Sequence, residues 1–195
     1  MTPPRGTRGS RRRAARGLLG AVLAVVTLGA TATLTGCTSS GGTVPGCRDP
    51  LRLAIIAQSV PSASYVPCIG GLQPGWEISG FDPAQDGTSF LLSSDRSPGQ
   101  PVTVRLSAGC RVSGASPAPA RAPGVLTYIR LDSISPRFAG TLYDVFPGGC
   151  VSYEFDFANG SQIALMEQFE QAIGLYPRQQ LRLVLKQELG VELDP

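Results

Sequence analysis

The sequence predicts an α+β fold: a mostly antiparallel sheet built from hairpins, with a C-terminal helical pair packed on one face of the sheet. Three observations support this class. Several runs between residues 89 and 157 alternate apolar and polar side chains with a period of two, which is typical of half-buried strands. Turn residues separate these runs. Beyond residue 161 the apolar spacing changes to three or four, and strands followed by helices are characteristic of α+β domains.

The clearest strand pair lies between residues 141 and 157. Apolar side chains at Val151, Tyr153, Phe155 and Phe157 alternate with polar ones. Residues 141–146 form a second β-rich run, and Pro147-Gly148-Gly149 lies between the two. This pattern predicts a β-hairpin.

Further strands are expected before it. Residues 89–93 and 102–106 suggest a second hairpin, with 95–100 as its connection, and residues 125–131 alternate again. Residues 113–124 contain three prolines and four alanines and indicate an exposed loop. Residues 51–57 fit a strand or a helix, and residues 61–81 are expected to be irregular and tied down by Cys68.

Two helices close the chain. Asn159-Gly160-Ser161 offers a helix start, and apolar residues then recur at helical spacing through Gly174. A second helix is expected from about Pro177, a favourable first-turn residue, to Gly190, a favourable C-terminal cap.

The N-terminal segment has the composition of an export signal. Residues 1–16 hold six arginines and no acid, and residues 17–34 are uncharged and rich in Leu, Val and Ala. Leu34-Thr35-Gly36-Cys37 follows, and it resembles the lipobox of bacterial lipoproteins. An uncleaved transmembrane anchor over 17–34 is the alternative, since about 18 uncharged residues just span a bilayer. Ser10-Arg11-Arg12 resembles the twin-arginine export pattern, so both this export pathway and the general secretory pathway remain open.

The lipobox resemblance covers the chain to about residue 37. It implies that the Cys37 thiol receives a diacylglycerol with fatty acyl chains such as palmitate and becomes the mature N-terminus. The expected organisation is a signal peptide at 1–36, a flexible tether at 37–46 and one disulfide-stabilised domain at 47–195. The expected location is the outer face of the cytoplasmic membrane, and the Arg, Ala, Gly and Pro bias fits an actinobacterial-type cell.

Removal of the signal peptide changes the sign of the net charge, which is +3 for the whole chain. Six of the 17 basic residues and none of the 14 acidic ones precede Cys37, so residues 37–195 carry 11 against 14, a net charge of −3. A mildly acidic domain with dispersed charges lacks the basic surface that phosphate groups require. Nucleic acid is therefore not an expected partner.

Four cysteines remain when Cys37 is assigned to lipid: Cys47, Cys68, Cys110 and Cys150. An even number outside the cytoplasm indicates two disulfides, with three connectivities open. Pairing of neighbours along the chain, Cys47 with Cys68 and Cys110 with Cys150, is favoured because it closes the shorter loops. No pair has zinc-ligand spacing and the chain has no histidine, so no metal site and no cofactor are expected.

The absence of histidine also excludes Ser-His and Cys-His nucleophiles. Glu154 and Asp156 point to the same face of one strand about 6.5 Å apart, near the spacing of an inverting glycosidase pair. The same alternation also describes a solvated outer face, which is the favoured interpretation.

Aromatic residues are the remaining candidates for a binding role. Tyr65 and Trp76 lie in a Pro/Gly-rich region, where exposed aromatic faces can anchor a partner or stack on a sugar. Packing in the core is the competing explanation for both. The sequence thus favours a non-catalytic binding or accessory lipoprotein with an envelope protein or glycan as partner. A carboxylate-dependent hydrolase of envelope glycans is the alternative.

Overall fold

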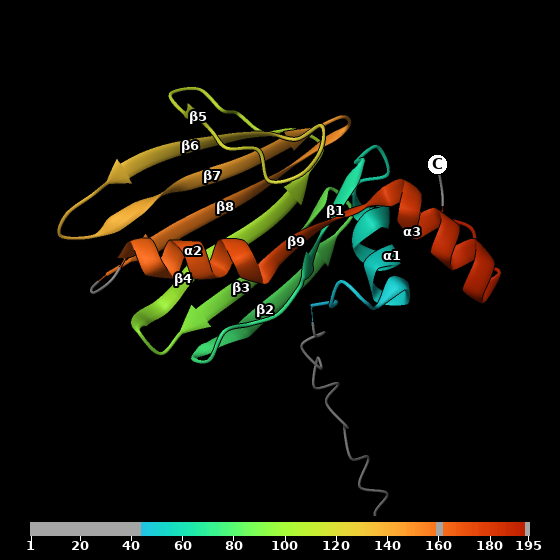
Figure 1. The fold of residues 1–195 in the computed structure, drawn as a ribbon, viewed down its shortest axis with the longest axis horizontal. Helices are drawn as coiled ribbons and strands as arrows, with labels where there is room; N and C mark the ends of the chain where they lie inside the picture. Colours follow the sequence, from blue (N-terminus) through green and yellow to red (C-terminus); the bar gives the residue numbers. More distant parts are fainter. Residues whose placement is uncertain (1–43, 159–161, 194–195) are drawn as a thin grey trace, which may run out of the picture. The chain divides into compact units, whose positions relative to one another are not determined.

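The computed structural model describes residues 44–158 and 162–193 (Figure 1). The lipobox, residues 38–43 of the tether and the predicted helix start at 159–161 lie outside the described residues. The folded part begins before the expected residue 47, because Val44 is 5% exposed and the Ile69 amide donates to the Pro45 carbonyl at 3.1 Å. Within these ranges, no helix has the length and apolar character needed to cross a membrane.

A seven-stranded antiparallel sheet dominates the fold, with the order β2-β3-β4-β8-β7-β6-β5. Its strands are β2 (Trp76–Ala84), β3 (Gly87–Ser94), β4 (Ser97–Ser107), β5 (Ser116–Ala118), β6 (Leu126–Ser133), β7 (Phe138–Phe146) and β8 (Gly149–Phe157). The chain makes a meander from β2 to β4, crosses to the far edge at β5, and returns strand by strand until β8 pairs with β4. The predicted α+β class with an antiparallel sheet is confirmed.

Both predicted hairpins are present. Phe146 pairs with Gly149, so Pro147 and Gly148 form the turn between β7 and β8. Gly148 has a φ of +74°, and a Cβ there would collide with the Ser62 carbonyl oxygen, so the turn requires glycine. The turn between β3 and β4 is tighter than expected, because Ser94 already pairs with Ser97.

The structure decides one open alternative and corrects two local expectations. Residues 51–57 belong to helix α1 (Pro50–Ser59), which Asp49 caps by accepting from the Arg52 amide at 3.2 Å. The segment 61–81 is not irregular, since it contains strand β1 (Tyr65–Ile69) and the start of β2. The expected loop at 113–124 contributes the short edge strand β5.

The C-terminal part also departs from a simple helical pair. Helix α2 (Gln162–Ala172) ends before Gly174, and residues 173–177 form strand β9 (Ile173–Pro177), which pairs with β1 in a two-stranded antiparallel sheet. Helix α3 (Arg178–Val184) follows and continues as one π-helical turn, η1 (Leu185–Leu189). Gly190 ends it in the left-handed conformation, as predicted.

Helices cover one face of the large sheet, called here the inner face. Phe90, Val104, Leu142 and Tyr153 lie in register on this face, and all are buried. Helix α1 covers its β2–β3 side and α2 lies across β8, whereas α3 packs against α1 (Figure 1). Phe169 of α2 is 0% exposed, with its ring 6.0 to 6.3 Å from three inner-face aromatic rings. The opposite, outer face carries polar side chains.

Two disulfides cross-link the fold, and their connectivity is the one that the sequence favoured. Cys47 is bonded to Cys68 on β1, and Cys110, which follows β4, is bonded to Cys150 on β8. The first disulfide packs on Gly174, where an added Cβ would lie 3.0 Å from the Cys47 sulfur. The second joins β8 to the segment that follows β4, where the chain begins its crossing to β5.

Candidate functional site

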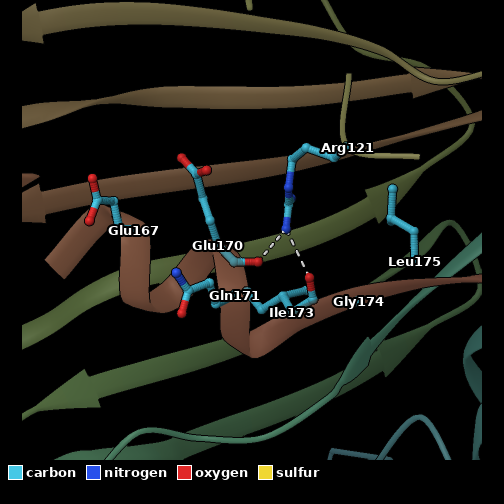
Figure 2. A pocket seen from close by; sticks show the side chains of 7 residues that line it. All are labelled: Arg121, Glu167, Glu170, Gln171, Ile173, Gly174 and Leu175. Carbon is cyan, nitrogen blue, oxygen red and sulfur yellow. Dashed lines mark hydrogen bonds between the residues drawn. The ribbon is translucent and has the colours of Figure 1, made fainter. Parts of the chain in front are cut away.

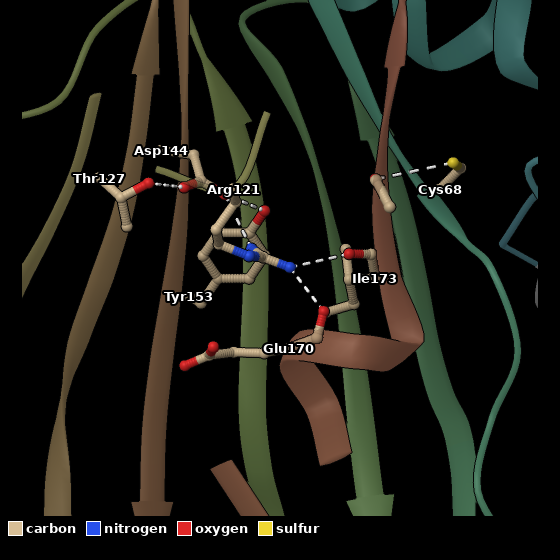
Figure 3. Close-up of polar contacts among 8 residues, drawn as sticks. Cys68, Arg121, Thr127, Asp144, Tyr153, Glu170 and Ile173 are labelled. Carbon is tan, nitrogen blue, oxygen red and sulfur yellow. Dashed lines mark hydrogen bonds and ion pairs between the residues drawn. The ribbon is translucent and has the colours of Figure 1, made fainter. Parts of the chain in front are cut away.

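A buried ion pair, which the sequence analysis did not predict, lies between the inner face and α2. Asp144 on β7 is 0% exposed. Its carboxylate accepts three side-chain hydrogen bonds at 2.8 Å each, from Thr127 Oγ1, Tyr153 Oη and Arg121 Nη1 (Figure 3). Buried charges are tolerated when they are paired and hydrogen-bonded in this way. The sequence feature that could have indicated this pair is the position of Asp144, which shares one face of β7 with the core residues Leu142 and Phe146.

Arg121 connects three parts of the fold. It comes from the segment between β5 and β6, and its Nη2 donates to the carbonyl oxygens of Glu170 at 2.6 Å and Ile173 at 2.8 Å, where α2 ends. Its guanidinium carbon also lies 4.8 Å from the centre of the Tyr153 ring. Burial raises the pKa of Tyr153 well above its ordinary value of 10.0, so this hydroxyl stays protonated and remains a donor to Asp144. The network therefore joins β6, β7, β8 and the end of α2 through satisfied hydrogen bonds.

A recess of about 310 Å³ opens beside this network (Figure 2). Its walls include Arg121, Glu167 and Glu170. Burial raises the pKa of the Glu170 carboxyl, and the Arg121 charge partly opposes that rise. Because Arg121 directs its donors to Asp144 and to two carbonyl groups, the recess presents acidic side chains rather than an available guanidinium. Within the described ranges, no group of three potential metal ligands occurs here or elsewhere.

Trp76 does not lie on an exposed loop, and the expectation of an exposed anchor is wrong for this residue. It is the first residue of β2, it is 7% exposed, and its ring packs edge-on against Phe157 at 6.4 Å. The indole nitrogen donates to Gln168 Oε1 of α2 at 3.0 Å. Pairing with β3 holds Trp76 opposite Ser94 and brings the indole under α2.

Tyr65 has a different environment. It is half-buried at the start of β1, its hydroxyl donates to the Pro123 carbonyl at 2.7 Å, and its ring meets Phe146 edge-on at 5.5 Å. It also lines a pocket of about 580 Å³, called here the Tyr65 pocket. The structure therefore separates the two aromatic candidates, leaving Tyr65 at a surface and Trp76 in the core.

The Tyr65 pocket lies between two segments that the β1–β9 pairing brings together. Its described walls are Pro61, Ser62, Ala63, Ser64, Tyr65, Pro177, Arg178, Gln179 and Arg182. They include two arginines and no carboxylate. Arg178 is 7% exposed and donates to the Ala57 carbonyl at 2.6 Å, whereas Arg182 is exposed and makes no hydrogen bond or ion pair with a described residue. The pocket is thus electropositive.

One wall residue of this pocket has an unsatisfied hydroxyl. Ser64 Oγ is buried and has no hydrogen-bond partner, and it is the one buried side-chain atom in this state among residues 44–158 and 162–193. An orphaned buried donor costs about 1–3 kcal/mol.

A second concave region lies on the outer face of the large sheet, and it is called here the outer groove. It has a volume of about 430 Å³. It brings together the carboxylates of Asp132, Glu154 and Asp156. Glu154 and Asp156 therefore do share one face, as alternation predicted.

Arginines engage two of these three carboxylates. Arg137 donates to both oxygens of Asp156, with its Nε at 2.9 Å from Oδ1. Arg130 donates to Asp132 at 3.0 Å. Glu154 is exposed and has no hydrogen bond or ion pair with the described part of the chain. The outer groove therefore has the features expected of a solvated sheet face, with one carboxylate left without a partner.

Comparison of the chain with family models, with curated proteins and with solved structures finds no match.

Proposed function

We propose that this chain is a bacterial lipoprotein, anchored through a lipid on Cys37 at the outer face of the cytoplasmic membrane, whose folded domain acts by non-covalent binding. The lipobox resemblance supports the anchor. Two disulfides support an oxidising location outside the cytoplasm. Substitution of Cys37 by Ser is expected to abolish acyl labelling and maturation, and acyl labelling that persisted in this variant would refute the anchor.

The binding function is assigned to the Tyr65 pocket. The observation that carries this assignment is that its described walls hold the exposed guanidinium of Arg182, several neutral donors and no carboxylate. The buried Arg178, which already donates to the Ala57 carbonyl, adds positive charge to the same wall. Such a wall recognises an anion, because arginine forms charge-assisted, often bidentate hydrogen bonds with carboxylates and phosphates. The proposed ligand is therefore an anionic group of an envelope glycan or protein, with the Tyr65 ring as the adjoining apolar wall.

The test is binding of envelope glycan fragments to the disulfide-bonded mature chain, measured by calorimetry at low and high salt. Fragments that carry a phosphate or carboxylate are expected to bind, and neutral fragments of the same size are not. Arg182→Ala should weaken binding by about ten-fold or more, the effect of losing one charge-assisted contact. Arg105→Ala, at another exposed arginine on β4, is the matched control. Equal losses in the two variants would refute the assignment.

The outer groove supports a second candidate function, hydrolysis of envelope glycans, because it collects three carboxylates in one concavity. In this mechanism Glu154 would be the proton donor, since both oxygens of Asp156 already accept hydrogen bonds from Arg137. Two observations weigh against it: Glu154 is exposed and the Asp156 side chain is 46% exposed, and Asp156 is committed to its ion pair. Release of reducing ends from purified envelope glycan, lost in Glu154→Gln, would favour the hydrolase over the binding function.

A further inference from the structure

Helix α1 has an exposed apolar side that nothing in the described fold covers. Leu51 and Ile55 are each 54% exposed, while Leu53 and Ile56 of the same helix are 0% exposed. Residues four positions apart share one side of a helix, so Leu51 and Ile55 form a single apolar strip pointing away from the core. These two residues, with Arg48 and Arg52 beside them, are called here the α1 strip.

The chain length between the proposed lipid and α1 limits where this strip can lie. Residues 38–43 separate Cys37 from Val44, and Val44 is already packed in the core. Seven Cα–Cα steps reach at most about 25 Å, whatever conformation the chain adopts. Cys47, three residues before α1, is fixed by its disulfide to β1. A lipid on Cys37 would therefore keep α1 close to the bilayer surface.

The charges around the strip match a membrane surface rather than a protein core. Arg48 and Arg52 flank Leu51 and are exposed, and Asp49, the one acid in residues 44–76, pairs with Arg52 at 3.2 Å. Long basic side chains at the edge of an apolar strip place their stems on lipid and their charges at the headgroups. Anionic lipids attract such positions when they are held near the surface.

We propose that the α1 strip lies on the membrane, with Leu51 and Ile55 inserted at the boundary of headgroups and acyl chains. This inference rests on the proposed anchoring at Cys37. The strip is too small to bind a bilayer alone, and the tether supplies the high local concentration that it needs. The contact fixes the orientation of the domain on the membrane.

The test couples the mature chain through Cys37 to a maleimide lipid in vesicles of phosphatidylcholine and phosphatidylglycerol. The other four cysteines are paired in disulfides, so coupling is specific. Because the lipid is attached chemically, the result does not depend on lipidation in the cell. Lipidation of Cys37 in the cell is tested separately by acyl labelling.

Brominated lipids quench tryptophans that enter the membrane, and the variants Ile55→Trp and Ile134→Trp report the two ends of the domain. Ile134 is 67% exposed and belongs to the connection between β6 and β7, so it is the matched control. That connection lies at the end of the large sheet away from α1 (Figure 1). Quenching is expected for Ile55→Trp and not for Ile134→Trp, and Leu51→Glu should abolish it. Equal quenching at both sites, or none at residue 55, would overturn the proposal. So would sedimentation of the uncoupled chain as a dimer that dissociates on Ile55→Glu substitution, since the strip would then be a contact between two copies.

Discussion

Substitution of Arg121 by Met is expected to destabilise the domain severely. The change removes the charge that compensates Asp144, which is 0% exposed, and it removes the donor to the carbonyl groups of Glu170 and Ile173. Methionine keeps a similar apolar stem, so the loss is mainly electrostatic. Removing one partner of a buried ion pair costs about 3–5 kcal/mol. That is a large share of the roughly 5–15 kcal/mol by which a typical domain is stable.

Arg137→Met provides the matched control, because Arg137 also pairs with an aspartate but at the surface, where the two side chains are 58% and 46% exposed. Exposed pairs contribute about 0–1 kcal/mol. Urea denaturation of the disulfide-bonded mature chain, followed by the fluorescence of the buried Trp76, gives both free energies of unfolding. If the two substitutions cost the same within error, the interpretation of Arg121 as a buried structural cation is incorrect.

Three further predictions concern the disulfide, a titrating group and the core. Replacing Cys110 and Cys150 by Ala should lower the free energy of unfolding by about 4 kcal/mol in the chain-entropy model, since the bond closes a separation of 40 residues. Chemical denaturation under non-reducing conditions measures this change, and an unchanged free energy of unfolding would argue against the bond. Burial raises the pKa of the Glu170 carboxyl in the folded state, so this group binds its proton more tightly when the domain is folded. Its contribution to the free energy of unfolding therefore falls as the pH rises from the ordinary pKa of 4.5 through the raised pKa. Glu170→Gln should therefore flatten that part of the stability profile and raise the free energy of unfolding at neutral pH, and an unchanged profile would contradict the assignment. Trp76→Ala should cost about 3–5 kcal/mol because it opens a cavity beside Gln168, and a loss below 1 kcal/mol would mean that the ring is not packed in the core.

The fold class was predictable because the strongest signals are local. The alternation at 151–157 and the turn at Pro147-Gly148 decide the β7–β8 hairpin without reference to any other part of the chain. The strand at 173–177 was not predictable in this way. Its partner β1 lies more than 100 residues earlier, so nothing in the local spacing distinguishes it from the last turn of α2.

The candidate site was less accessible to sequence reasoning for a related reason. The Tyr65 pocket is made from two segments that only the β1–β9 pairing brings together, and Arg182 carries no local signal of its position. Trp76 was misplaced because neighbouring prolines and glycines suggested a loop, whereas pairing with β3 placed the ring in the core. Glu154 and Asp156 were placed on the correct face because alternation determines that property directly.

The strand order also has a consequence for the order in which the domain assembles. A chain that folds as it emerges from its N-terminus completes β2, β3 and β4 well before Gly149–Phe157 is available, so the hydrogen-bonding edge of β4 stays open while the next three strands emerge. Open edges of this kind readily pair with other chains. The middle of the finished sheet is thus the last part to close, and the bond between Cys110 and Cys150, which sits at that junction, retains β8 against β4 once it has arrived.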